Sequence, residues 1–412
     1  MLAAVVLSGA CAERQDGGEV CPVLCPEQSI PTRDTVIEAI GVSATVSPYP
    51  GLGSEPTLLL ASRGDSLDTR AVIRFDSIPS RYRRSASDTT TLPITFVDSA
   101  ELRLRIDTAG TKATTPVTVS VYDVDTTAAD SSTAALVALF RADRLVGSAT
   151  FDTAALKDTL RVKIDTAFLR QRIVGRQRVR FGVQVTSGES VQLRVFSSLV
   201  DAGPQLVFDP SADTLTRVGS YRPVSLTPVD DEALARDLAD FTLIATGSND
   251  RVSGTTPNVL RVGGLPSSRG YLRFELPASI VDSGTVVRAT LTLTQIPSIR
   301  FDSAERVTLF AHPSIASAVI SAPDKAALLI AAATDSAQVM PNGAGLIEFE
   351  LVRLFRRWRG TKAVDQPRVL ILRASTEGIS PVELRIHDVN AASGLRPRLR
   401  ITYVPRVDFG LP

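Results

Sequence analysis

The sequence predicts an all-β protein built from two tandem jelly-roll-like antiparallel β-sandwiches with short helical turns. Three observations predict this fold: apolar and polar residues alternate over short segments, turn-forming clusters separate those segments, and the second half of the chain repeats the first. The 412 residues suffice for two or three domains. An apolar share of 44% is that of a folded chain, and no apolar run reaches the length of a membrane-spanning helix.

A period of two marks the expected strands. Leu102, Leu104 and Ile106 share one phase, while charged residues take the other, and residues 117–122 and 191–195 follow the same pattern. This period predicts half-buried antiparallel strands with one face toward a core and one toward water. Clusters of Pro, Gly, Asp and Thr between such segments predict the turns.

Five segments of the first half recur in the second half in the same order. Their offset stays at about 190–199 residues, which chance similarity would not maintain. We therefore predict an internal duplication. The matched pairs are residues 71–76 with 270–275, 99–104 with 288–293, 117–122 with 307–312, 191–195 with 382–386, and 203–208 with 396–401.

The duplication predicts where each sandwich begins and ends. Residues 241–244 open the second copy as residues 36–39 open the first. Between the copies, Pro and Asp residues interrupt every periodic pattern. The expected organisation is a first sandwich at 34–210, a linker at 211–232, a second sandwich at 233–406 and a tail at 407–412.

The N-terminal segment predicts an exported protein. Residues 1–10 are apolar and end in small residues, as a secretory signal does, but the basic segment that opens such signals is missing, as after a start codon placed too far downstream. Residues 7–11 resemble the lipobox of bacterial lipoproteins, which implies lipid attachment at Cys11, although Ser8 stands where that family prefers Leu. A frayed apolar end with an incidental cysteine is the alternative.

The remaining cysteines fit the same compartment. Cys21 and Cys25 are predicted to form a local disulfide in an exported chain, because no further metal ligands lie nearby. Residues 11–33 then form a polar tether. We expect a membrane-anchored lipoprotein at the outer membrane or cell surface, which contacts the membrane only through its lipid anchor.

The order of the repeated segments resembles the DNRLRE-type domain of secreted bacterial proteins, a family related to carbohydrate-binding jelly-roll modules. Its motifs appear here as the strands at 54–60 and 256–262 and as a helical turn at 351–360 that carries Trp358. In the first copy, Ile173 replaces that Trp. The resemblance covers about residues 34–406 and departs most at 128–145. It implies binding of a polysaccharide.

Composition and motifs exclude several classes of function. A net charge of +1 argues against a nucleic-acid binder, and two His residues exclude a His-rich metal site. No catalytic or cofactor motif is present, so we predict no enzyme, no cofactor and no metal. His312 and His387 are expected at the surface. Calcium in the loops at 64–68 or 248–250 is the alternative to an absence of metal.

Two sets of side chains are candidates for ligand binding. Arginine pairs bidentately with carboxylates, so an arginine cluster after the helical turn suits an acidic glycan, with a solvated face as its alternative. Tyr49 and Tyr271 suit a neutral sugar, while Trp358 is expected in the core because it shares an apolar helical face with its neighbours. The cluster comprises Arg353, Arg356, Arg357 and Arg359.

The predicted function is therefore non-catalytic binding of a polysaccharide, with an acidic one as a candidate, by an envelope lipoprotein. A structural or adhesive module that engages envelope proteins is the first alternative. A polysaccharide lyase or hydrolase, which would need paired carboxylates, is the second.

Overall fold

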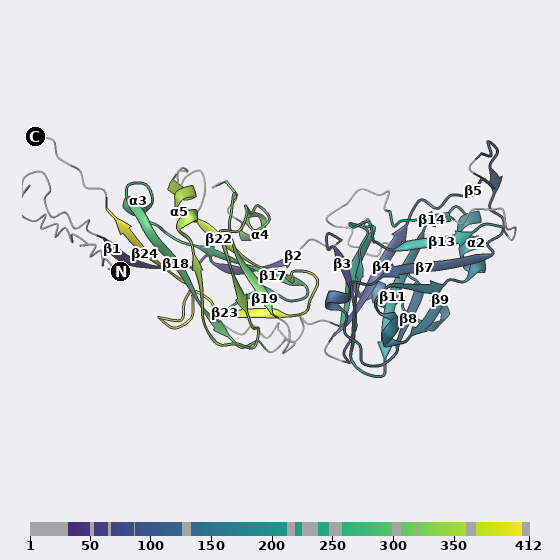
Figure 1. Cartoon of the computed structure of the whole chain (residues 1–412), viewed down its shortest axis with the longest axis horizontal. Helices are drawn as coiled ribbons and strands as arrows, with labels where there is room; N and C mark the ends of the chain where they lie inside the picture. Colours follow the sequence, from purple (N-terminus) through teal and green to yellow (C-terminus); the bar gives the residue numbers. More distant parts are fainter. Residues whose placement is uncertain are drawn as a thin grey trace, which may run out of the picture.

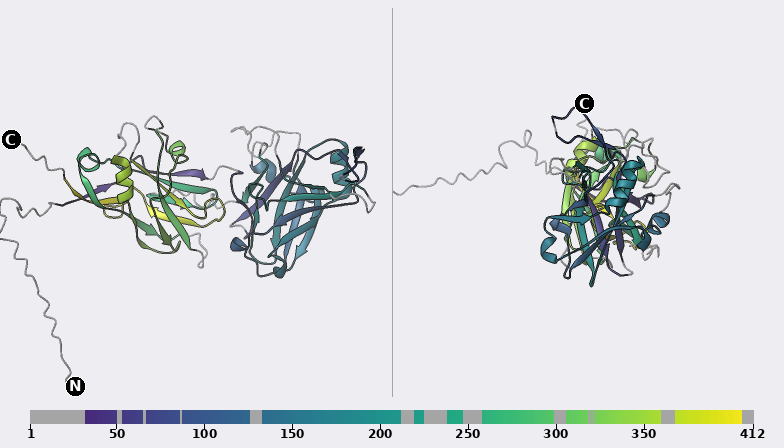
Figure 2. Two further views of the ribbon diagram at one scale, coloured as in Figure 1. Left: turned by 45° about the horizontal axis from the view of Figure 1, so that its top comes forward. Right: turned by 90° about the vertical axis from the view of Figure 1, so that its right-hand side faces the viewer.

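The computed structural model describes residues 32–49, 53–64, 67–85, 87–125, 133–211, 219–224, 238–246, 258–298, 306–317, 320, 322–359 and 368–405. These residues form two antiparallel β-sandwiches, which Figures 1 and 2 show as two lobes. The expected all-β fold is confirmed. No helix within the described ranges is long and apolar enough to cross a membrane.

Domain 1, as its strands pair, takes its described residues from between 53 and 246. Its strands are β3 (Thr57–Ser62), β4 (Asp68–Phe75), β5 (Arg81–Tyr82), β6 (Leu92–Pro93), β7 (Ser99–Arg105), β8 (Val117–Asp123), β9 (Leu145–Phe151), β10 (Thr159–Lys163), β11 (Val179–Ser187), β12 (Val191–Phe196), β13 (Gln205–Asp209), β14 (Gly219–Tyr221) and β15 (Asp240–Thr246). Its helices are η1 (Thr108–Gly110), α1 (Thr133–Val137), η2 (Ala142–Arg144), η3 (Thr153–Ala155) and α2 (Thr166–Val174). One sheet has the order β10-β7-β13-β14, and the other has β12-β3-β4-β11-β8-β9 with β15 added to β4.

Domain 2 takes residues 32–49 and the described residues from 258 to 405. Its strands are β1 (Arg33–Glu38), β2 (Ala44–Tyr49), β16 (Val259–Gly263), β17 (Ser267–Arg273), β18 (Thr285–Ile296), β19 (Val307–Pro313), β20 (Asp335–Val339), β21 (Gly345–Glu350), β22 (Val369–Ala374), β23 (Glu383–His387) and β24 (Arg398–Val404). Its helices are α3 (Ala278–Val281), α4 (Pro323–Ala326) and α5 (Val352–Arg359). The strand order is β1-β24-β18-β23-β16-β17-β22-β19-β20, with β2 on β17 and β21 on β18.

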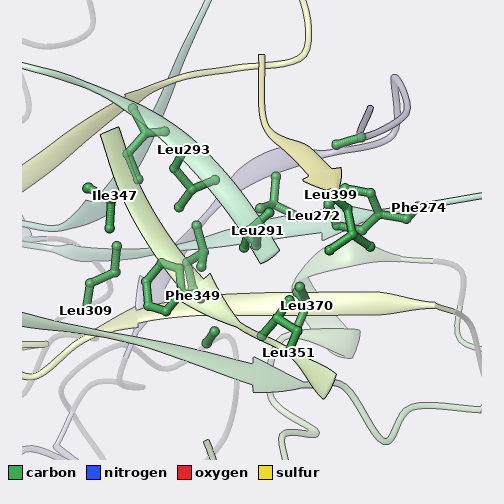
Figure 3. Close-up of a cluster of buried hydrophobic side chains, with 14 of the residues drawn as sticks. Leu272, Phe274, Leu291, Leu293, Leu309, Ile347, Phe349, Leu351, Leu370 and Leu399 are labelled. Carbon is green, nitrogen blue, oxygen red and sulfur yellow. The ribbon is translucent and has the colours of Figure 1, made fainter. Parts of the chain in front are cut away.

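Each domain has a core made by the inward phase of its strands. In domain 2 the core includes Leu291, Leu293 and Phe349, drawn in Figure 3. Trp358 is fully buried among them, which confirms its expected place in the core. In domain 1, Ile173 of α2 is buried in the same manner.

Two arms of the chain are exchanged between the domains. The first arm, residues 33–49, precedes the main part of domain 1 in the sequence, yet its β1 pairs with β24 and its β2 pairs with β17. The second arm, described at residues 219–224 and 238–246, precedes the main part of domain 2, yet its β14 pairs with β13 and its β15 with β4. Figure 1 shows purple β1 and β2 in the lobe that contains β24 and β17.

The two arms make equivalent contacts. The hydroxyl oxygen of Thr45 accepts a hydrogen bond from the backbone N–H of Arg261 at 2.9 Å. The hydroxyl oxygen of Thr242 accepts one from the backbone N–H of Leu59 at 3.0 Å. The strands β3 and β16, which donate these bonds, belong to matched segments of the repeat. The first arm therefore contacts domain 2 in the same way as the second arm contacts domain 1.

This pairing overturns part of the expected domain boundaries. Residues 34–49 were assigned to the first sandwich but pair with the second, and residues 240–246 were assigned to the second but pair with the first. Residues 219–221, expected in the linker, form β14 of domain 1. The physical reason is that alternation along a strand shows that the strand lies in a sheet, but not which sheet it joins.

The exchange predicts that two matched substitutions destabilise different domains. Thr45→Val leaves the N–H of Arg261 without its acceptor and should destabilise domain 2 by about 1–3 kcal/mol. Thr242→Val should destabilise domain 1 by a similar amount. Since Trp358 is the only tryptophan and lies in domain 2, its fluorescence during denaturant unfolding reports on that domain. Thr45→Val should move this transition to lower denaturant and Thr242→Val should not. The reverse result would contradict the exchange.

Two buried carboxyl groups lie where the second arm meets domain 1. Glu55 and Asp240 are only 7% and 2% exposed. Asp240 accepts hydrogen bonds from the backbone N–H of Ser198 at 2.7 Å and from its hydroxyl at 2.6 Å. Burial raises the pKa of Asp240 and raises the pKa of Glu55 to about 7, with the nearby Asp240 adding to the shift of Glu55.

The raised pKa of Glu55 makes domain 1 sensitive to pH. The folded pKa of about 7 lies above the ordinary value of 4.5, so the stabilising contribution of the protonated group is complete below pH 4.5 and is lost as the pH rises to 7. The loss amounts to about 3 kcal/mol at most. We expect Glu55→Gln to flatten the fall of the domain 1 melting temperature between pH 4.5 and 7, measured by calorimetry. The exposed Glu348→Gln is the control, and profiles parallel to the unsubstituted chain would contradict the assignment.

Candidate ligand-binding face

The candidate site lies on the outward face of four neighbouring strands of domain 2, β1, β24, β18 and β21. Because side chains alternate along a strand, burial of Leu291, Leu293 and Leu399 turns their neighbours outward. Figure 3 shows these three side chains in the core beneath this face. We call the outward side of the four strands the binding face.

The binding face is hollowed. The hollow has a volume of about 540 Å³ and is lined by three arginines, four threonines, two carboxylates and two apolar residues. Its lining comprises Asp34, Thr35, Val36, Arg288, Thr290, Thr292, Leu346, Glu348, Arg398, Arg400 and Thr402. Both hydrogen-bond donors and acceptors are therefore available to one ligand.

Strand register sets the polar groups of the hollow in rows. Thr292 lies opposite Arg398 on one side and opposite Glu348 on the other. Thr290 lies between Arg400 and Glu350 in the same way. Each row thus runs from a guanidinium through a hydroxyl to a carboxylate across three strands.

The first arm supplies the acidic group at one end of the hollow. Asp34 accepts a hydrogen bond from the Thr402 hydroxyl at 2.5 Å and pairs with Arg400 at 3.1 Å. The hydrogen bond from Thr402, and then that from Arg400, lower the pKa of Asp34. Asp34 therefore stays ionised, and its negative charge partly neutralises the positive charge of Arg400.

Arg398 and Glu348 differ from their neighbours in this respect. Arg288 lies 3.8 Å from Glu350, and Arg400 has Asp34. By contrast, neither Arg398 nor Glu348 has an ion-pair partner among the residues that the structure describes. Arg398 is half-buried and Glu348 is exposed, so both can turn their polar groups toward a ligand.

A second hollow of about 430 Å³ is lined by Thr334, Asp335, Glu350, Val352, Arg353 and Arg356. Of this lining, Glu350 lies opposite Thr290 of the first hollow and 3.8 Å from its Arg288. Its carboxylate accepts hydrogen bonds from the backbone N–H groups of Ala289 at 3.1 Å and Val352 at 3.2 Å. The backbone N–H of Glu350 donates to Asp335 at 2.8 Å. These bonds hold β18, β20, β21 and α5 together at one point.

The predicted arginine cluster is divided between two environments. Arg353 and Arg356 line the second hollow, whereas Arg357 and Arg359 are exposed on α5 and line neither hollow. Around the helix, Arg356 and Arg357 lie on opposite sides of Arg353, so a hollow on the side of Arg356 does not reach Arg357.

The predicted tyrosines do not form a platform in the described structure. Tyr271 is only 3% exposed and packs with Val46 and Ile371, so its expected role as an exposed sugar platform is wrong. β2 lies beside its strand β17 in the same sheet, and the segment around α4 packs over them. Alternation alone does not reveal this second layer. Tyr49 lies in β2, but its side chain is outside the described residues.

The histidines are buried more deeply than expected. His312 is 8% exposed, which corrects its expected surface position, and His387 is half-buried. The Nδ1 atom of His312 lies 2.8 Å from the carbonyl oxygen of Ala331, and burial lowers the pKa of His312. A neutral ring that donates to this carbonyl accounts for both facts. Nearby, Arg269 and Glu377 form a buried bidentate pair at 2.6 and 2.9 Å.

Several predicted sites lie wholly or partly outside the described residues. Cys11, Cys21 and Cys25 lie outside, as do residues 248–250 and part of the loop at 64–68. Asp68, the described acidic residue of that loop, pairs with Arg70 at 2.7 Å. Within the described ranges, no three His, Cys, Asp or Glu residues gather as metal ligands would.

No family model and no curated protein matches this chain. Among solved structures, the chain is similar to the Macrobrachium rosenbergii nodavirus, with 10% identity over 97% of this chain and 96% of that chain and a TM-score of 0.17. It is also similar to the N-terminal CBM22-1-CBM22-2 tandem domain from Paenibacillus barcinonensis, with 10% identity over 90% and 93% and a TM-score of 0.18. At these scores neither likeness carries an argument about a ligand. The DNRLRE resemblance stays a prediction.

The central row of the candidate site was missed in the sequence. The residues around Arg398 and Thr292 read as outward positions of alternating strands, which is a signal available in the sequence. Nothing in that signal shows that β24 and β18 are neighbours, or that Asp34 reaches them from the other end of the chain. Only the register of paired strands reveals these facts.

Proposed function

We propose that the chain is a non-catalytic polysaccharide-binding protein whose ligand lies across the binding face of domain 2. The observation that supports this most is the row formed by Arg398, Thr292 and Glu348. It combines a donor, a hydroxyl and an acceptor at the floor and rim of an open hollow of about 540 Å³.

A carbohydrate suits this row because its hydroxyl groups both donate and accept hydrogen bonds. Charged groups make the stronger of such bonds, and here they are held on a sheet rather than on a loop. Arg398 and Glu348 lie two strand spacings apart, which is about 10 Å. That distance leaves room for a polar ring between them, above Thr292.

The charge of the site allows both neutral and acidic glycans. Across the two hollows, five arginines face four carboxylates. A carboxylate on the ligand would pair with Arg398, Arg353 or Arg356, and this contribution would weaken as salt screens it. Hydroxyl groups would bind with less dependence on salt.

The two flat rows also suit a polymer. The second hollow, whose Glu350 lies opposite Thr290 of the first, brings in Arg353 and Arg356 from the predicted cluster. An extended chain laid from β1 to α5 would cross both. We further propose that the protein is exported and anchored through Cys11, which the motif at residues 7–11 supports.

A second candidate function is favoured by one observation, the exchange of arms. A structural or adhesive module that engages protein partners would use strands that can pair with a further chain.

Binding of the full chain to a panel of neutral and acidic polysaccharides, including alginate, tests the proposal at low and raised salt. Arg398→Ala and Glu348→Ala should each weaken binding about 10-fold or more, since each removes a charge-assisted hydrogen bond. Arg306→Ala, an exposed arginine at the start of β19 in the other layer, is the matched control and should leave the affinity unchanged. Absence of saturable binding across the panel, or equal loss in all three variants, would contradict the proposal.

A further inference from the structure

The two arms differ in how they are connected to the main parts of the chain. Each arm precedes one sandwich in the sequence and completes the other. The second arm lies between the two main parts of the chain and is tied at both ends. The first arm is connected to the main part of domain 1 through residues 50–56, and the residues before it, 1–31, lie outside the described part of the chain.

The receiving edges of domain 2 are open to an incoming strand. β1 is the last strand of its sheet order, beside β24. β2 pairs with the stretch of β17 that β16 leaves free, because β16 meets β17 only at Gly263 and Ser268. Docking of the first arm therefore requires no threading through a closed sheet. Backbone hydrogen bonds at such an edge do not depend on which chain supplies the strand.

Charge on the arm complements charge on the receiving edge. Asp34 pairs with Arg400 at 3.1 Å, and Glu38 pairs with Arg396 at 3.0 Å. Six residue pairs join β1 to β24, from Arg33 with Tyr403 to Glu38 with Arg398. These ion pairs favour one register of β1 against β24.

The connection after the arm is short. Seven residues, 50–56, separate β2 from β3, and two of them, Pro50 and Pro56, restrict the backbone. A short connection that cannot fold back on its own domain favours exchange of the segment that it carries. The same chain already shows this outcome between its own two domains.

We propose that a second copy of this chain is a partner for the same edges, so that two chains exchange their first arms and form a dimer. In the dimer, β1 and β2 of each chain pair with β24 and β17 of the other. Every contact of the closed monomer is kept, and only the chain that supplies the arm changes. This inference is independent of the proposed polysaccharide binding.

Mass action sets the balance between the two forms. In the monomer the arm acts at an effective concentration on the order of millimolar because it is tethered. Dimers therefore accumulate when chains fold together at high concentration, and the ratio of dimer to monomer rises with concentration. Once formed, a dimer persists because separation requires both arms to leave their edges.

Disulfide trapping between paired positions tests the exchange. Val36 lies directly opposite Arg400 on the outward face, at a separation that a disulfide can bridge. One chain carries Val36→Cys and another carries Arg400→Cys, both in a background of Cys11→Ser, Cys21→Ser and Cys25→Ser. The two chains are unfolded, mixed, refolded together at two concentrations tenfold apart, and oxidised. We expect a disulfide-linked heterodimer whose ratio to monomer rises up to about tenfold.

Two controls decide the interpretation. A chain with both Val36→Cys and Arg400→Cys should close as a monomer at low concentration, which shows that the two positions meet. A mixture of Val36→Cys with Leu145→Cys, an exposed position in domain 1, should give no heterodimer above background. Light scattering of the unsubstituted chain refolded under reducing conditions should give a dimer mass at high concentration.

Three results would overturn the inference. In the first, the double variant closes internally while the mixture gives no heterodimer above the Leu145→Cys control. In the second, the double variant forms no disulfide of either kind, which refutes the pairing itself. In the third, the unsubstituted chain keeps the mass of a monomer at every refolding concentration.

Discussion

Antiparallel pairing of two short arms with strands far along the chain is the constraint on which the rest of this structure depends. Without β1 and β2, the edges of β24 and β17 would expose unpaired backbone groups, and β13 and β4 would do so without β14 and β15. Hydroxyl groups of Thr45 and Thr242 fix both arms to equivalent backbone positions. The two sandwiches follow one another in the sequence, but each contains strands that precede the main part of the other.

The binding face depends on the pairing of the first arm with domain 2. Asp34 reaches the hollow only because the first arm crosses to domain 2, and there it pairs with Arg400 and Thr402. The arm thus shapes the charge of the site while leaving Arg398 for a ligand. Exchange of arms between chains would keep this site intact but would build it from two chains. The proposed ligand binding and the proposed dimer therefore depend on the same structural element, the first arm.

The predictions from sequence succeeded where local pattern decides structure. Alternation placed Leu102 and Leu104 inside, and the helical period placed Trp358 in the core. They failed where a further layer covers a strand. Tyr271 is buried because the segment around α4 packs over β17 and β2, and the arginines of α5 diverge because only Arg353 and Arg356 turn toward a hollow. Neither fact is a property of a single segment.

By itself, the sequence determined the class of fold, the internal duplication and the inward phase of most strands, because side-chain periodicity and turn chemistry are local properties. Tertiary structure alone decided which sandwich each arm completes, which strands are neighbours on the binding face, and how Asp34 meets Arg400. Backbone hydrogen bonds that join strands are nearly independent of side-chain identity. The choice of partner strand is therefore made by the geometry of the whole chain.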